Sequence, residues 1–186
     1  MHIKQKCVES YERLKNLKLV ADEVGIPWQT VYTHLRSMNC CVVGDKKRYG
    51  SIKDKLAEKF ESRFLRVVNF AIPNNEYKYQ AKIDFFVGDT SIDVKVSSLQ
   101  NAGVQPSGKK YAARWSYCIS KQKKTADFFV MYALNKDESV RHVFLIPKEI
   151  AITCTTISIP ESKKSKWFEY EVHENELYGF FEWFLK

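Results

Sequence analysis

The sequence predicts an α/β fold over residues 51–186, a mixed central sheet flanked by helices, preceded by a small all-α domain over residues 1–44. Three observations predict this organisation. Residues 1–40 have the apolar spacing of short helices, whereas residues 77–159 are dominated by strand patterns. Between them, residues 44–50 form a basic segment bounded by glycines, which we expect to be a linker or hinge.

Composition narrows the class of protein. The chain has 186 residues, of which 45% are hydrophobic, enough for a packed core and too many for general disorder. Its formal net charge is +8 and its pI is about 9.1. A basic protein of this size favours a polyanionic partner, and nucleic acid is the leading candidate.

Targeting signals and disulfides are not expected. No run approaches the ~18 apolar residues of a membrane span, and the first residues lack the apolar stretch of a secretory signal. The five cysteines are odd in number and include no C-x-x-C pair, which argues against a disulfide framework or a structural zinc site. We therefore expect a cytoplasmic protein with reduced thiols and no membrane partner.

The N-terminal helices contain a specific pattern. Residues 17–24 have the spacing of a short buried helix, and Gly25 follows where a tight turn needs a positive φ. Pro27 suits the first turn of the next helix. Alanine at position 21, glycine four residues later and Val31 six residues further resemble the helix-turn-helix motif. The alternative is a plain helical hairpin that touches no DNA.

If the motif reads DNA, the second helix, about residues 28–38, is its recognition helix. Several of its outward side chains are able to bond base edges or phosphates. Lysines of the following linker would add phosphate contacts. The expected DNA-binding residues of this part are Gln29, Thr30, Thr33, His34, Arg36, Lys46 and Lys47.

Residues 51–67 predict an amphipathic helix, because apolar residues repeat along it at helical spacing. Ser51 is a suitable N-cap, and Asp54 follows three residues later. Glu58 and Glu61 lie on the flank of this helix.

Residues 82–97 predict two strands around a two-residue turn at Gly88-Asp89, since glycine at the first loop position suits a type II′ hairpin. That turn fixes the register, so that Phe85 faces Ile92. The expected core face comprises Ile83, Phe85, Ile92 and Val94, and the opposite face comprises Lys82, Asp84, Asp93 and Lys95.

The polar face of this hairpin is the strongest candidate for chemistry. Asp84 and Asp93 would be directly opposed, with Cβ atoms roughly 5 Å apart. Like charges so placed destabilise a sheet unless a cation compensates them, and hard carboxylate oxygens suit Mg²⁺. Lys95 projects from the same face, where it would position a water or stabilise a phosphate. The alternative is a surface hairpin with solvated charges.

The segment Ile83-Asp84 … Asp93-Val94-Lys95 resembles the motif of the PD-(D/E)XK nuclease superfamily, which includes restriction enzymes, Holliday-junction resolvases and some intron-encoded homing endonucleases. Isoleucine replaces the proline of the motif. The resemblance implies a restriction-endonuclease-like fold and Mg²⁺-dependent hydrolysis of DNA phosphodiester bonds. The family often adds a glutamate from the preceding helix, for which Glu61 is the candidate and Glu58 the alternative.

The resemblance continues through the expected strands at 114–119, 126–130 and 143–147, and covers roughly residues 51–150. This order is similar to group I intron homing endonucleases and related phage nucleases. Basic residues after the hairpin would line the phosphate path. They are Lys109, Lys110, Arg114, Lys121, Lys123 and Lys124.

The predicted function is a site-specific, Mg²⁺-dependent DNA endonuclease of homing or restriction type, with double-stranded DNA as its partner. Residues 174–186 should form a closing helix, and the aromatic C-terminal segment should support a homodimer on DNA. Two other functions stay open. One is a DNA-binding regulator on a catalytically inactive nuclease fold, and the other is a structure-selective nuclease of junctions or RNA.

Overall fold

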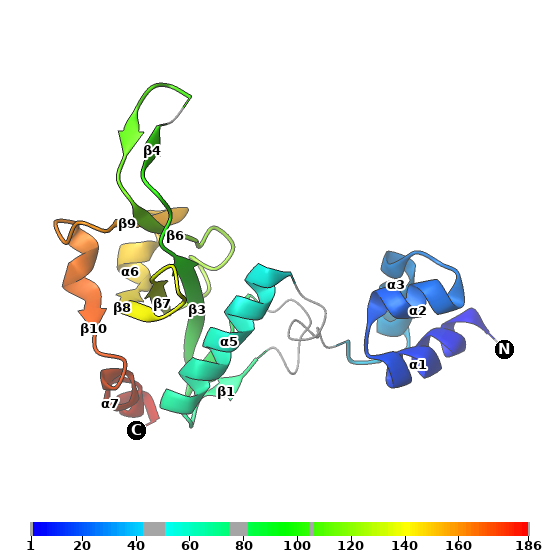
Figure 1. Cartoon of the computed structure of the whole chain (residues 1–186). Coiled ribbons are helices and arrows are strands. Elements are labelled where there is room, and N and C mark those ends of the chain that lie inside the picture. The colour runs from blue at the N-terminus through cyan, green and yellow to red at the C-terminus, as the bar shows by residue number, and fades with distance from the viewer. Residues whose placement is uncertain (1, 43–50, 75–81, 105, 186) are drawn as a thin grey trace.

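The computed structural model describes residues 2–42, 51–74, 82–104 and 106–185. Three helices come first, α1 (Ile3–Leu14), α2 (Leu17–Val24) and α3 (Trp28–Ser37). A mixed sheet with flanking helices follows (Figure 1). The predicted fold class, helices first and then a mixed sheet flanked by helices, is confirmed.

The three N-terminal helices pack around a hydrophobic core of their own. The side chain of Asn16 caps α2 by accepting hydrogen bonds from the backbone N–H groups of Lys18 and Leu19. Gly25 ends α2 at a φ of 76°, the left-handed conformation expected of it. The buried residues of this core are Cys7, Tyr11, Leu17, Val20, Ala21, Val31, Leu35 and Val42.

The central sheet has six strands in the order β1-β2-β3-β7-β8-β10. Strands β3 and β7 pair in parallel, and the other neighbours pair antiparallel, so the sheet is mixed. The strands are β1 (Ile72–Pro73), β2 (Phe85–Val87), β3 (Thr90–Ser98), β7 (Phe128–Leu134), β8 (Val140–Pro147) and β10 (Glu171–Val172).

The two faces of the sheet are covered differently. On one face, Phe60 and Phe64 of α5 (Ile52–Val67) and Phe181 of α7 (Glu176–Glu182) share a core with β2, β3, β7 and β8. The other face carries a second sheet of β6 (Arg114–Cys118) and β9 (Thr156–Pro160), together with α6 (Lys148–Ala151) and the 3₁₀ helix η1 (Lys166–Tyr170). Both faces are therefore buried, as the long apolar strands require.

Helix α5 begins and ends where the sequence places it. Ser51 and Asp54 form a capping box, in which the Ser51 hydroxyl accepts from the Asp54 N–H at 3.2 Å and the Ser51 N–H donates to the Asp54 carboxylate at 2.9 Å. The cap sets where α5 begins, and its aromatic side chains Phe60 and Phe64 pack against the sheet.

Two further elements are a hairpin that projects from the central sheet and the C-terminal helix. Strands β4 (Gly103–Val104) and β5 (Lys110–Tyr111) form a narrow hairpin that projects from the body (Figure 1). The predicted closing helix is instead α7 followed by a short 3₁₀ turn, η2 (Trp183–Leu185). In the described part of the chain, no helix is long and apolar enough to cross a membrane.

Candidate functional site

The β2–β3 hairpin has the predicted turn and the predicted register at its tip. Gly88 adopts a φ of 55°, and the strands pair Val87 with Thr90 and Phe85 with Ile92. A Cβ atom at Gly88 would lie 2.6 Å from the backbone oxygen of Phe184, so the C-terminal segment closes directly over this turn.

Regular strand pairing ends at Asp84. The Asp84 N–H donates to the Ile92 carbonyl at 3.1 Å, but the Asp84 carbonyl accepts from the N–H of Asn74 at 2.8 Å. The N–H of Val94 donates at 2.9 Å to Oδ2 of Asp84. The Asp84 carboxylate therefore replaces a main-chain acceptor of the neighbouring strand, which fixes its position beside β3.

This departure corrects part of the predicted hairpin. Ile83 does not share a core face with Phe85, because the chain leaves the strand between them and Ile83 packs on the opposite face of the sheet, with Trp115 and Phe129. Lys82 is exposed and lies outside the paired strand, so it does not oppose Lys95 as predicted. The side-chain amide of Asn74 donates a hydrogen bond to the Ile83 carbonyl at 3.1 Å, which stabilises the backbone where it leaves the strand.

Asp84 and Asp93 form a buried carboxylate pair. Their exposed fractions are 7% and 1%, and the two side chains interact directly. Burial raises the pKa of Asp93 to about 7, with the charge of Asp84 adding to the rise and the ammonium of Lys95 opposing it. The Asp93 carboxyl group therefore gains or loses its proton near neutral pH.

Lys95 provides the positive charge at this pair. Its Nζ donates a hydrogen bond to Oδ1 of Asp93 at 2.9 Å and lies 2.7 Å from Oδ2. The closer contact is an ion pair without hydrogen-bond geometry. When both aspartates are ionised, two carboxylates face one ammonium, and an all-oxygen donor set with excess negative charge fits Mg²⁺.

Glu61 does not complete a carboxylate triad with this pair. It is buried in α5, with an exposed fraction of 8%, and Glu58 is half-buried on the same helix. Among the described residues, no group of three or more His, Cys, Asp or Glu side chains is placed so that it could hold a metal ion. Any further ligands would come from backbone carbonyls, water or a bound phosphate, and the catalytic role of Glu61 stays a prediction.

The neighbourhood of Lys95 includes residues that sequence reasoning did not single out. Cys118, at the end of β6, is exposed, and hydrogen bonds with Ser120 lower the pKa of its thiol, with further lowering by the charges of Lys95 and Lys121. Lys121, predicted to contact phosphate, is exposed and faces the same region as Lys95. Asn74 is another such residue, since its hydrogen bonds to the carbonyls of Ile83 and Asp84 come from a separate strand end.

The candidate reading helix is α3. Gln29, Thr30, Thr33 and Arg36 are all exposed, and three of them recur at i, i+4 and i+7, which places them along one face. Their DNA-binding role stays a prediction. Lys46 and Lys47 lie outside the described residues.

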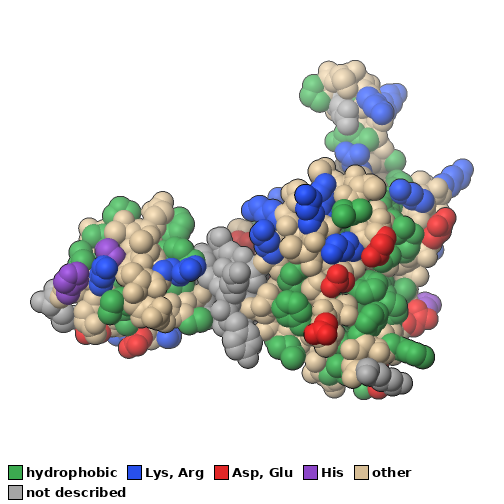
Figure 2. Space-filling model, turned by 180° about the vertical axis from the view of Figure 1, so that it is seen from behind, with side chains coloured by type: hydrophobic (Ala, Val, Ile, Leu, Met, Phe, Trp, Pro, Cys, Tyr) green, Lys and Arg blue, Asp and Glu red, His purple; other side chains and the backbone are tan. Residues whose placement is uncertain are grey.

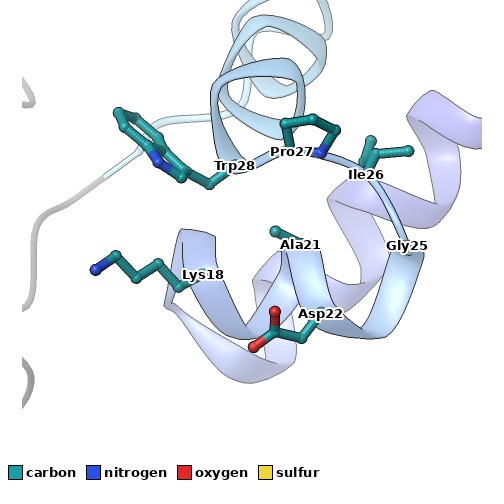
Figure 3. Close-up of a pocket in the computed structure, with 7 residues that line it drawn as sticks. All are labelled: Lys18, Ala21, Asp22, Gly25, Ile26, Pro27 and Trp28. Atoms are coloured by element: carbon teal, nitrogen blue, oxygen red, sulfur yellow. The ribbon is translucent and has the colours of Figure 1, made fainter.

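A hollow of about 560 Å³ lies where α2 meets the start of α3 (Figure 3). Small Ala21 forms part of its floor, and the side chains of Lys18 and Trp28 flank its opening on one side. The Lys18 ammonium and the exposed Trp28 indole therefore lie beside the start of α3. The remaining lining residues are Asp22, Gly25, Ile26 and Pro27.

Comparisons with known proteins add little beyond this geometry. No family model matches the chain, and no curated protein matches it. One solved structure with similarity is described as the structure of a bacterial homing endonuclease, I-Ssp6803I, with a TM-score of 0.42 and 15% identity, covering 75% of this chain and 93% of that one. At this TM-score and identity, the likeness indicates nothing about the activity or substrate of this chain.

Proposed function

We propose that the chain is a Mg²⁺-dependent DNA endonuclease. The observation that supports this most is the buried Asp84–Asp93 pair with the Lys95 ammonium 2.7–2.9 Å from Asp93. Bound between these carboxylates, Mg²⁺ would supply a Lewis acid for the phosphate and lower the pKa of its bound water.

The chain's own residues prepare this chemistry. The Val94 N–H holds Asp84 in place, and β3 presents Asp93 and Lys95 two residues apart on one face. With Mg²⁺ held by Asp93, the Lys95 ammonium would be free to donate to a phosphate oxygen or to the attacking water. Asp84 is thus positioned by a backbone N–H, and Asp93 and Lys95 by their contact with each other, before substrate binds.

Charge and the N-terminal helices support DNA as the proposed substrate. The net charge of +8 favours a polyanion. We propose residues 1–44 as the reading domain, with α3 in the major groove, and residues 51–186 as the nuclease domain. One site of this kind cuts one strand, so a double-strand break would need a homodimer on DNA.

The test is cleavage by the purified chain of the source genome's own DNA and of a supercoiled plasmid. We expect discrete fragments or a nick in Mg²⁺, and binding without turnover in Ca²⁺, which coordinates oxygen but activates water poorly. Asp93→Asn and Lys95→Gln should bind DNA without cutting it, whereas Asp89→Asn, an exposed aspartate in the same hairpin, should cut normally.

Three results would contradict the proposal. Cutting by Asp93→Asn at the wild-type rate would mean that the hairpin is only structural. Binding by the wild-type chain with no cutting in Mg²⁺ or Mn²⁺ would favour a DNA-binding regulator. Preferential cutting of junctions or RNA would favour a structure-selective nuclease.

A further inference from the structure

The hairpin of residues 100–114, called the arm below, stands out from the body of the sheet (Figure 1). Its two sides pair in one register, with Gln100 opposite Arg114, Gly103 opposite Tyr111 and Val104 opposite Lys110. The arm links β3 to β6, so it extends the strand that carries Asp93 and Lys95.

The base and middle of the arm are held by specific contacts. Gln100 and Arg114 exchange two backbone hydrogen bonds, of 2.9 and 3.1 Å. The Tyr111 ring lies directly against Gly103, where a Cβ atom would meet the Tyr111 hydroxyl at 2.6 Å. The Arg114 guanidinium stacks over the same ring at 4.3 Å. The arm is therefore a preformed ribbon rather than a loose loop.

Charge is concentrated around the arm. Residues 94–126 carry seven lysine and arginine side chains and no aspartate or glutamate, while the whole chain has a net charge of +8. Figure 2 shows Lys and Arg side chains on the projecting arm and on the adjoining surface of the body. The seven residues are Lys95, Lys109, Lys110, Arg114, Lys121, Lys123 and Lys124.

The far end of the arm is slender and exposed. Lys109 and Lys110 are exposed, and so is Val104, with an exposed fraction of 60%. The middle is built from small residues, Ala102, Gly103, Ala112 and Ala113. An exposed valine and two exposed lysines thus lie at the end of a narrow ribbon with small side chains. Such a ribbon is suited to enter a groove lined by negative charge.

We propose that the arm enters the major groove of duplex DNA as a second reading element, separate from α3. This proposal rests on the DNA endonuclease function proposed above. The major groove of B-DNA, about 12 Å wide and about 8.5 Å deep, admits a two-stranded ribbon whose strands are about 4.8 Å apart. Lys109 and Lys110 contact phosphates at the groove edges, and Val104 contacts a thymine methyl group.

Duplex RNA does not suit this element. The major groove of A-form RNA is deep and narrow, so side chains on such a ribbon cannot reach the bases there. The proposal therefore commits to B-form DNA as the occupant of the arm.

The covalent connection fixes where the arm contacts DNA. From Lys95 to Gln100 is five residues, at most about 17 Å of extended strand, and from Lys95 to Val104 is nine residues, at most about 30 Å. At about 3.4 Å per base pair, the contacts of the far end of the arm should fall within about nine base pairs of the cut bond.

The experiment compares two lysine pairs in the full chain. K109A/K110A removes two charges from the arm, and K163A/K164A removes two exposed charges from the loop before η1. Duplex binding is measured in Ca²⁺ over a range of salt concentrations, and dimethyl sulfate protection reports guanine N7 in the major groove. We expect K109A/K110A to bind roughly tenfold more weakly, to lower the salt slope by about two, and to lose a protected patch within about nine base pairs of the cut. K163A/K164A should keep that patch.

A second variant, Val104→Asp, places a carboxylate at the exposed end of the arm and should lose the same patch without changing the melting temperature. If the wild-type chain cuts DNA but both lysine pairs behave alike, the arm proposal is overturned while the nuclease function stands. A wild-type chain that neither binds nor cuts duplex DNA overturns both. Loss of a dimer by light scattering, with the protection pattern unchanged, would assign the arm to a second copy of the chain and also overturn the proposal.

Discussion

Replacing Asp93 by asparagine should stabilise the metal-free protein at alkaline pH. The pKa of Asp93 is raised from an ordinary 3.8 to about 7, mainly by burial. Three pKa units at about 1.4 kcal/mol each give an upper bound of about 4 kcal/mol by which the ionised side chain destabilises the folded state. Asparagine has nearly the same shape and cannot ionise, so it removes this penalty.

The sign of the pH dependence follows from the direction of the shift. Because the folded state holds the Asp93 proton more tightly than the unfolded state does, stability is fully present below about pH 4 and is lost as pH rises towards 7. Wild type and Asp93→Asn should therefore be equally stable near pH 4. They should diverge through pH 7 and differ by a few kcal/mol at pH 8.5, in favour of the variant.

Thermal melts in EDTA at pH 4 and pH 8.5 measure this difference. For a chain of this size, each kcal/mol moves the melting temperature by roughly 2–4 °C. The control is Asp89→Asn, which removes the same charge from an exposed position of the same hairpin. Adding Mg²⁺ at pH 8.5 should raise the melting temperature of the wild type and leave that of Asp93→Asn unchanged. A variant no more stable than wild type at pH 8.5 would refute the reasoning, as would a difference that does not change with pH.

Three other substitutions test separate parts of the structure. Asp84→Ala should destabilise the fold by about 1–3 kcal/mol because it leaves the Val94 N–H without its acceptor, whereas Asp84→Asn keeps an acceptor and should not. Denaturant unfolding measures both variants, and equal stability of the two would contradict this role of Asp84. Gly88→Ala should also destabilise, because its φ is positive and its new Cβ would meet the Phe184 carbonyl oxygen at 2.6 Å, and an unchanged melt would show that the C-terminal segment does not close over the turn. Arg36→Ala should weaken binding to the specific site by roughly 1–3 kcal/mol while leaving binding to random DNA nearly unchanged, as measured by competition titration; equal losses on both would remove α3 as the reader.

Local rules explain why some elements were predictable. Helix α5 was predictable because its cap and its apolar repeat lie within a few residues of one another. The tip of the β2–β3 hairpin was predictable for the same reason, since a two-residue turn with Gly88 at its first position dictates the pairs beside it.

Contacts between distant segments explain what the sequence did not predict. The predicted register of the hairpin ends at Asp84, whose backbone carbonyl accepts a hydrogen bond from the N–H of Asn74, ten residues earlier. No local sequence pattern predicts this contact. The arm was also missed as an element. Its pairs between Gln100 and Arg114 span many residues, and the small residues between them have weak strand propensity. The sequence predicted that Lys109 and Lys110 contact phosphate, but it did not predict the two-stranded ribbon that carries them.

The ion pair between Lys95 and Asp93 would make binding of the proposed Mg²⁺ an exchange of one cation for another. A monovalent ion such as K⁺ brings no more charge than the ammonium it displaces, so the exchange gains nothing in electrostatic energy. A divalent ion brings one further unit of charge, which compensates the second carboxylate when both aspartates are ionised. For the Mg²⁺ proposed above, the tethered ammonium would compete with the incoming cation for Asp93, and this competition would favour divalent over monovalent ions.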